Sequence, residues 1–198
     1  MGEIIIREKP KEVSYETIHE ILYSAHESTR RKGTIIQTSL MNAQQLEERV
    51  GPLGKCFVAY DNDNIVGTAS YRVTTRNSWY YKGKVVNRIL IGVLPEYKGQ
   101  HICENLFDTI FQEAKQEGIK GIETRTAENN EIIQHICKKE GAHYVGFMPT
   151  LPDHYSVVMF QWTDGCPWPE WLLKSFYSVK RFLVKIRYKP DKTKRFGI

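Results

Sequence analysis

A nearly continuous apolar run, Val85 to Leu94, constrains this chain more than any other stretch. Such a run is typical of a central strand that is buried on both faces. It leads straight into "VLPEYKGQHICENLF", residues 93–107, which turns at Pro95, passes Gly99 and continues with the spacing of an amphipathic helix. A helix N-terminus presents free N–H groups, so a strand that enters a helix through a short basic turn is a common phosphate-binding arrangement. The sequence therefore predicts an anion site at this turn.

The other patterns predict an α/β mixture with a mixed sheet. Hydrophobic periodicity and turn residues mark the borders of each element. The expected elements are a strand Glu3–Arg7, a helix from Ser14 to near Gly33, a helix from Asn42 to Gly51, strands Lys55–Tyr60 and Ile65–Thr74 joined by a hairpin at Asp61–Asn64, a turn at Lys82-Gly83, a strand Gly121–Thr126, a helix from Asn129 or Asn130 to Gly141, and strands Tyr144–Met148 and Tyr155–Trp162 on either side of the loop "PTLPDH".

Charge is unevenly distributed along the 198 residues. The formal net charge is +5, but residues 168–198 alone carry +7, which leaves −2 on residues 1–167. A nearly neutral main body does not suit a nucleic-acid-binding domain, so no nucleic-acid partner is expected. The four cysteines have neither CxxC spacing nor metal-ligand spacing with histidine, which predicts reduced thiols, no metal site and a cytoplasmic protein.

Two short segments follow a known pattern. In the first, Val93 and Pro95 match V-x-P, and Lys98 stands for the basic or amide residue that opens [RQ]-x-x-G-x-[GA]. In the second, "ENNEIIQHICKKEGA", Asn130 and Gly141 match N-x-x-A-x-x-L-Y-x-x-x-G in register. With this element order, residues 3 to 162 resemble the GNAT superfamily of acetyl-CoA-dependent N-acyltransferases. The resemblance implies a mostly antiparallel central sheet flanked by helices.

The resemblance also implies acetyl-CoA, or another acyl-CoA, as co-substrate. The pyrophosphate would lie over the turn, where backbone N–H groups hold it without a charged side chain. Ile91 and Val93 would line the pantetheine arm, and the Val93 N–H would stabilise the oxyanion. The implied cofactor-binding residues are Ile91, Val93, Lys98, Gly99, Gln100, His101, Ile102 and Asn130.

His101 and Cys103 replace the two glycines of the first pattern. Two outcomes are open. Either the backbone still binds the pyrophosphate, with His101 in an ordinary first-turn helical conformation, or the side chains block the approach. We favour binding, because a helix N-terminus does not by itself require a positive φ.

The catalytic groups are less well marked. Cys137 replaces the tyrosine that serves as the leaving-group acid in the family, and it is either that acid or a packed, inert side chain. Ile89 and Leu90 occupy the positions where many relatives place a carboxylate, so Glu123 is the best remaining base. Its alternative is an ordinary strand residue, solvated or paired with Arg125. On strand Ile65–Thr74 and just beyond it, Tyr71, Arg72 and Arg76 could line an acceptor site.

The implied function is transfer of an acetyl or short acyl group from CoA to a primary amine of a small molecule. The alternative is a GNAT-fold domain that has lost turnover and acts as a CoA-binding or partner-binding module. The departures at His101, Cys103 and Cys137 favour this alternative, whereas the backbone nature of CoA binding favours the enzyme.

The family pattern ends before the basic C-terminus. We therefore expect a GNAT-like domain over residues 1–164 and an extension over 165–198. From Pro169 to Arg187 the extension has an amphipathic helical pattern, with aromatic residues on one face and Lys or Arg on the other. We predict that its apolar face packs on the protein itself or at a homodimer contact, with the Lys/Arg face exposed. Peripheral contact with an anionic membrane and recognition of an anionic partner are the alternatives.

Overall fold

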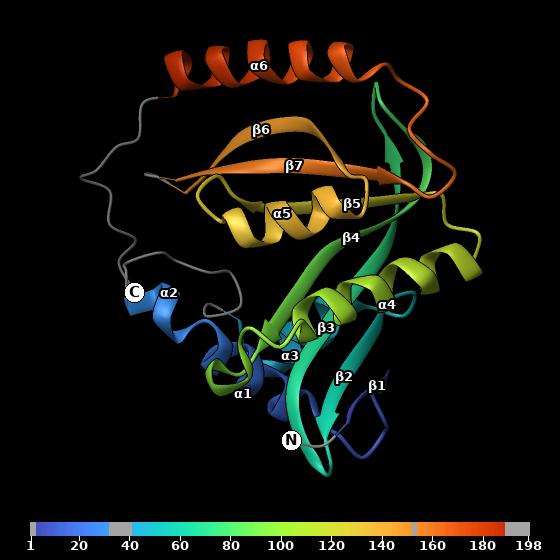
Figure 1. Ribbon diagram of the computed structural model, residues 1–198, viewed down its shortest axis with the longest axis vertical. Helices are drawn as coiled ribbons and strands as arrows, with labels where there is room; N and C mark the ends of the chain where they lie inside the picture. The colour runs from blue at the N-terminus through green and yellow to red at the C-terminus, as the bar shows by residue number, and fades with distance from the viewer. Residues whose placement is uncertain (1–2, 32–40, 152–153, 189–198) are drawn as a thin grey trace. The chain divides into compact units, whose positions relative to one another are not determined.

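The computed structural model describes residues 3–31, 41–151 and 154–188 (Figure 1). Its strands form a seven-stranded sheet, which confirms the mixed, mostly antiparallel α/β class. The elements are β1 (Ile4–Glu8), α1 (Tyr15–Ala25), α2 (Glu27–Arg31), α3 (Ala43–Val50), β2 (Lys55–Asp61), β3 (Asn64–Asn77), β4 (Lys82–Val93), the 3-10 turn η2 (Pro95–Tyr97), α4 (Ile102–Gln116), β5 (Gly121–Ala127), α5 (Glu131–Lys139), β6 (His143–Leu151), β7 (His154–Trp162) and α6 (Glu170–Arg187).

The chain divides into two compact units. The first comprises Met1–Thr74 and Val86–Gly118, and the second comprises Thr75–Val85 and Ile119–Ile198. Strand β4 contributes residues to both units, because the division falls between Val85 and Val86.

In the first unit, helices cover both faces of the strands β1, β2 and β3. Ile18 and Leu22 of α1 and Leu46 of α3 form one cluster with Val58 of β2. Since side chains alternate along a strand, the neighbouring residues of β2 face the other way, toward α4. Burial on both faces explains why five consecutive residues of β2 are buried.

Close packing of α1 fixes the end of β4. A Cβ added at Gly92 would lie 2.9 Å from the Ala25 Cβ and 3.1 Å from a Leu22 methyl group, so only glycine lets α1 approach so closely. Directly after β4, the Leu94 N–H donates to the Val66 carbonyl of the neighbouring strand β3 at 2.9 Å. These contacts set the direction in which β4 enters η2 and α4.

The second unit is built on antiparallel β5, β7 and β6, with β7 in the middle. Helix α5 packs against β5 and β7, and α6 lies along β6 (Figure 1). Leu173 of α6 is buried in a cluster with Val145, Val158 and Phe160. The C-terminal helix therefore belongs to the core of this unit.

Local sequence signals placed several element ends correctly. Ser14 caps α1 through the Thr17 N–H, and Asn42 forms the expected capping box with Gln45. The hairpin at Asp61–Asn64 is present, because Asp61 pairs directly with Asn64.

Three expected borders differ or cannot be judged. The helix from Ser14 ends at Ala25, where His26 is the C-cap, and the expected end near Gly33 lies outside the described residues. The expected turn at Lys82-Gly83 is wrong: β4 already begins at Lys82, and the Ser78 N–H closes the turn on the Tyr81 carbonyl at 2.9 Å. The expected loop "PTLPDH" is shorter than predicted, because β6 ends at Leu151 and β7 begins at His154. Residues 152–153 between them lie outside the described part.

No helix in the described ranges is long and apolar enough to cross a membrane.

Candidate functional site

In the first unit, backbone groups near the end of β4 point away from β3. The Leu94 N–H points to β3, and the backbone groups of successive residues in a strand point to opposite sides. The Val93 N–H and the Ile91 carbonyl therefore point away from β3, on the same edge. This edge carries the two residues that were expected to line a pantetheine arm.

The turn after β4 leaves backbone donors open. The Lys98 N–H donates to the Pro95 carbonyl and closes η2. Among the described residues, no backbone carbonyl accepts a hydrogen bond from the N–H of Gly99 or Gln100. Gly99 has φ +82°, and a Cβ built there would meet no atom of the described residues within 4 Å, so the space beside Gly99 is open in this part of the chain. Open donors beside open space fit an anion at the start of α4.

His101 corrects one sequence-based expectation. It does not adopt a first-turn helical conformation: it is the N-cap of α4, with φ 59° and ψ 10° in the left-handed region. This left-handed conformation explains why the family motif has a glycine at this position. A histidine adopts it at a cost of about 1–2 kcal/mol relative to glycine. Its ring is exposed, with Nδ1 3.1 Å from the Glu104 carboxylate. The ring does not cap the helix, which leaves the N-terminus of α4 without a side-chain cap.

His26 is a polar group that the sequence patterns did not reveal. Its Nε2 lies 3.1 Å from the Ile91 carbonyl oxygen. Since a carbonyl can only accept, Nε2 donates, and Nδ1 of the neutral ring is left as the acceptor. Burial is the main cause that lowers the pKa of His26, and the nearby charges of Lys98 and Arg30 add to it. A neutral imidazole therefore lies on the same edge of β4 as the Val93 N–H.

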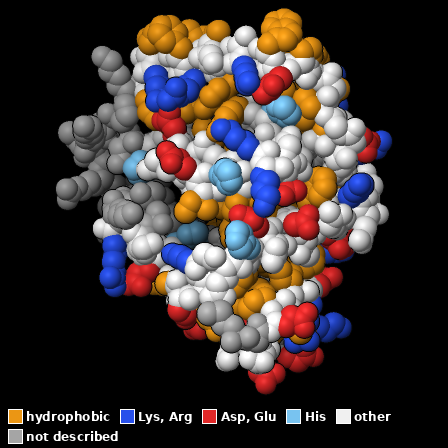
Figure 2. All heavy atoms as spheres, viewed as in Figure 1, with side chains coloured by type: hydrophobic (Ala, Val, Ile, Leu, Met, Phe, Trp, Pro, Cys, Tyr) orange, Lys and Arg blue, Asp and Glu red, His pale blue; other side chains and the backbone are white. Residues whose placement is uncertain are grey.

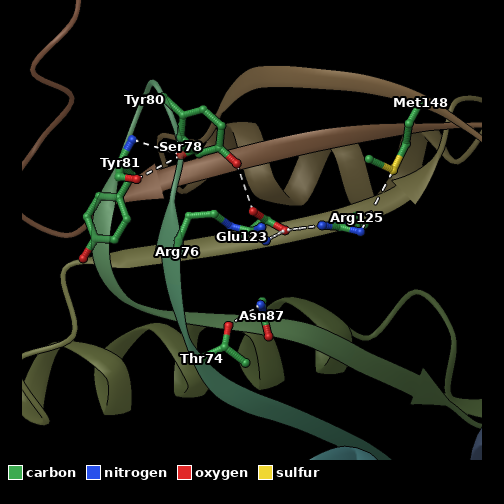
Figure 3. A network of polar contacts seen from close by, with 9 residues as sticks. All are labelled: Thr74, Arg76, Ser78, Tyr80, Tyr81, Asn87, Glu123, Arg125 and Met148. Carbon is green, nitrogen blue, oxygen red and sulfur yellow. Dashed lines mark hydrogen bonds and ion pairs between the residues drawn. The ribbon is translucent and has the colours of Figure 1, made fainter.

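Glu123 belongs to the second unit, where β5 holds it in a buried polar network (Figure 3). One of its oxygens accepts from Arg76 at 2.5 Å and from Arg125 at 3.0 Å, and the other accepts from the Tyr80 hydroxyl at 2.9 Å. Burial, together with the Glu123 charge, raises the pKa of Tyr80 to about 12, so Tyr80 stays a donor at neutral pH. Of the two alternatives for Glu123, this geometry fits the ion-paired strand residue.

Cys137 lies in α5 and is completely buried. Burial raises the pKa of its thiol to about 11, although a hydrogen bond with Thr124 acts in the opposite direction. A thiol in this state is protonated at neutral pH and has no exposed surface. The burial favours the packing alternative, and the role as leaving-group acid stays a prediction.

Asn130 has a local task. Its side-chain oxygen accepts from the Ile133 N–H at 3.4 Å and caps α5. The side chain expected to contact a cofactor thus already has a partner in its own helix.

The expected acceptor residues are not all available to a substrate. Tyr71 is 1% exposed and stacks on Phe57, and Arg76 binds Glu123. Arg72 is half-buried, with its guanidinium about 3.6 Å from the position of a Cβ on Gly51. Within residues 3–31, 41–151 and 154–188, no cluster of His, Cys, Asp and Glu could hold a metal ion.

The family model of the acetyltransferase (GNAT) family matches residues 15–142, about two thirds of the sequence. The chain belongs to the GNAT acetyltransferase family. Its members use acetyl-CoA, and the chain is accordingly an N-acetyltransferase-family protein with an acetyl acceptor as its second substrate. No curated protein matches the sequence.

Solved GNAT structures share the fold at low sequence identity. The ribosomal-protein-S18-alanine N-acetyltransferase from Escherichia coli has a TM-score of 0.62 at 13% identity, over 81% of this chain and 94% of that chain. Arabidopsis thaliana NAA60 in complex with acetyl-CoA has a TM-score of 0.61 at 14% identity, over 82% of this chain and 100% of that chain. The IAA acetyltransferase from Bacillus cereus has a TM-score of 0.54 at 15% identity, over 81% of this chain and 99% of that chain.

The residues of the first unit fit the pyrophosphate of CoA. Within the described residues, the N–H groups of Gly99 and Gln100 have no backbone acceptor, a Cβ on Gly99 would meet no atom within 4 Å, and α4 starts without a side-chain cap. The replacements His101 and Cys103 leave these backbone donors in place.

Proposed function

We propose that the protein transfers an acetyl group from acetyl-CoA to a primary amine of a small molecule. The observation that carries the proposal is the uncapped start of α4, where the Gly99 and Gln100 donors meet open space. We assign the CoA pyrophosphate to Lys98–Ile102 and the pantetheine arm to the β4 edge at Ile91 and Val93. The Lys98 side chain is exposed and adds a positive charge beside the pyrophosphate.

Acetyl-CoA supplies the acetyl group as a thioester. The amine nitrogen forms a bond to the carbonyl carbon, the carbon–sulfur bond breaks, and the thiolate leaves and is protonated. The Val93 N–H, which points away from β3, donates to the developing oxyanion.

We assign the removal of the amine proton to His26. Its neutral ring lies on the same strand edge, two residues before Val93, and its Nδ1 is the unprotonated nitrogen. His26 takes precedence over Glu123 as the base, because both carboxylate oxygens of Glu123 already accept hydrogen bonds. Cys137 remains the candidate for protonating the leaving thiolate.

The choice of a small-molecule acceptor comes from the family resemblance, and solved relatives differ on this point. The E. coli relative is named for an alanine of a ribosomal protein, and another similar structure is a putative phosphinothricin N-acetyltransferase. A panel of small primary amines and of peptides with free N-termini therefore tests the proposal. Thiol release from acetyl-CoA that depends on a small amine supports it. Thiol release only with peptides would contradict it and make a peptide N-terminus the acceptor.

The alternative, a binding module without turnover, predicts a different result. Isothermal titration would then show saturable acetyl-CoA binding, while no member of the panel releases thiol.

The divisions of the chain also enter as proposals. We propose residues 1–164 as the acyltransferase domain and residues 165–198 as an extension.

A further inference from the structure

Helix α6 is docked in the opposite orientation to the one that its amphipathic pattern predicts. The expected arrangement hides the apolar face and exposes Lys and Arg. Instead, Arg181 and Lys185 both bind the Glu128 carboxylate, with nitrogen–oxygen distances of 2.6 and 2.8 Å. Tyr177 stacks on Tyr144 of β6, with ring centroids 4.7 Å apart.

The apolar side of α6 consequently faces outward. Figure 2 shows two groups of hydrophobic side chains at the upper edge of the molecule, over α6. Five large apolar side chains of this helix are between 57% and 68% exposed: Trp171, Val179, Phe182, Leu183 and Ile186. We call these five residues the α6 ridge. A single exposed leucine is ordinary, whereas five large apolar side chains exposed on one side of one helix indicate an interaction surface.

Positive charge flanks the ridge. A groove of about 290 Å³ beside it is lined by Phe176 and Leu183, with Lys180 and Arg187 as its charged residues. Lys174, which is paired with Glu170, is 71% exposed near the start of the helix. The sequence from Trp168 onward carries a net charge of +7.

These features together select one kind of occupant. A second copy would place another +7 segment against the first, and the like charges would repel. An anionic lipid surface instead accepts apolar side chains into its acyl region and places its phosphates beside the flanking Lys and Arg. Trp171 and Phe182 are side chains that favour this interface.

We propose that α6 is a membrane-surface helix: the α6 ridge inserts into an anionic bilayer, and its basic flanks contact the headgroups. The helix lies in the plane of the interface, since its inner side is held by β6 and Glu128. This surface is independent of the acetyl-CoA site and of the acceptor assigned above.

Vesicle co-sedimentation of the full chain tests the proposal, with phosphatidylcholine vesicles that contain or lack phosphatidylserine. We expect binding to the anionic vesicles that weakens at high salt. The double variant Phe182→Asp/Ile186→Asp should lose at least about tenfold in affinity, because two charges replace inserted apolar groups. Leu53→Asp is the matched control, since Leu53 is 68% exposed in the first unit and should leave binding unchanged.

A charge variant separates the two parts of the surface. Lys174→Gln/Arg187→Gln should weaken binding to anionic vesicles by about twenty-fivefold, at roughly fivefold per charge. Its binding to neutral vesicles should not change.

Three results would overturn the proposal. A wild-type protein that stays in the supernatant with anionic vesicles excludes the lipid surface. Equal binding to both vesicle types excludes the anionic headgroup. A dimer in sedimentation velocity that Phe182→Asp/Ile186→Asp dissociates, without vesicle binding, makes a second copy the occupant.

Discussion

The helices α4 and α5 both follow a strand in a GNAT chain, yet they begin in opposite ways. Helix α4 starts at His101, which gives no side-chain cap, and no backbone carbonyl in the described part of the chain accepts from the N–H groups of Gly99 and Gln100. Helix α5 starts at Asn130, whose side chain accepts from the Ile133 N–H. One N-terminus is thus left for a ligand, whereas the other is satisfied by its own chain.

The same contrast extends to the side chains near each helix. In the first unit, His26 and the Val93 N–H lie on one strand edge and offer a base and a donor. In the second unit, Glu123 and Cys137 are buried and already bonded to neighbours. From this comparison we propose that acetyl-CoA recognition depends on backbone groups and survives the replacement of the two motif glycines by His101 and Cys103.

The largest expected effect is on the open N-terminus. Gly99→Asp should weaken acetyl-CoA binding by about a thousandfold in isothermal titration, because a carboxylate would lie against the pyrophosphate at a cost of several kcal/mol. Gly118→Asp is the control, since Gly118 also has a positive φ and open space around its Cβ position. Equal affinities of a folded Gly99→Asp variant and the wild type would place the pyrophosphate elsewhere.

The second prediction concerns His26. His26→Gln should lower kcat/KM by about a hundredfold, the usual loss for a general base, although a glutamine amide can still donate to Ile91. In the wild type, kcat/KM should fall as the pH drops through the lowered pKa of His26, below its ordinary 6.5, because protonation removes the acceptor Nδ1. The variant should lose this acid limb.

The exposed His135 on α5 gives the matched control. His135→Gln should keep both the rate and the pH profile. If the kcat/KM profile of His26→Gln keeps the acid limb of the wild type, another group is the general base.

The third prediction concerns Cys137 in the second unit, where a smaller effect on catalysis is expected. If it only packs, Cys137→Ala should cost about 1–2 kcal/mol of unfolding free energy and leave kcat within about twofold. Cys56→Ala is a close match, because Cys56 is also buried and its thiol pKa is also raised to about 11. A hundredfold drop in kcat for Cys137→Ala, absent in Cys56→Ala, would make Cys137 the leaving-group acid.

The smallest effect is expected at the cap of α5. Asn130→Ala should lower the unfolding free energy by about 1 kcal/mol without changing the affinity for acetyl-CoA. Denaturant unfolding and titration measure the two quantities, and the exposed neighbour Asn129→Ala should change neither. A clear loss of affinity in Asn130→Ala would restore Asn130 as a cofactor-binding residue.

Much of this architecture could be predicted from the sequence, because it depends on local rules. The caps at Ser14 and Asn42, the hairpin at Asp61–Asn64 and the strand–turn–helix at Pro95 each follow from residues within one turn of each other. The family resemblance added the mostly antiparallel central sheet flanked by helices, and acetyl-CoA as co-substrate.

The rest depends on contacts between residues far apart in the sequence. His26 and Ile91 are 65 positions apart, and no motif links them. The orientation of α6 was mispredicted because the helical pattern alone cannot show that Glu128, 53 positions before Arg181, binds the basic face. The left-handed φ of His101 was missed because histidine by itself does not predict it.

The amide chemical shifts of Gly99 and Gln100 test the central claim most directly. They are measured in ¹⁵N-labelled protein during titration with acetyl-CoA and, separately, with S-acetylpantetheine, which lacks the pyrophosphate. We expect both amides to shift strongly with acetyl-CoA and hardly at all with S-acetylpantetheine. Saturable acetyl-CoA binding that leaves the Gly99 and Gln100 amides unshifted would contradict it.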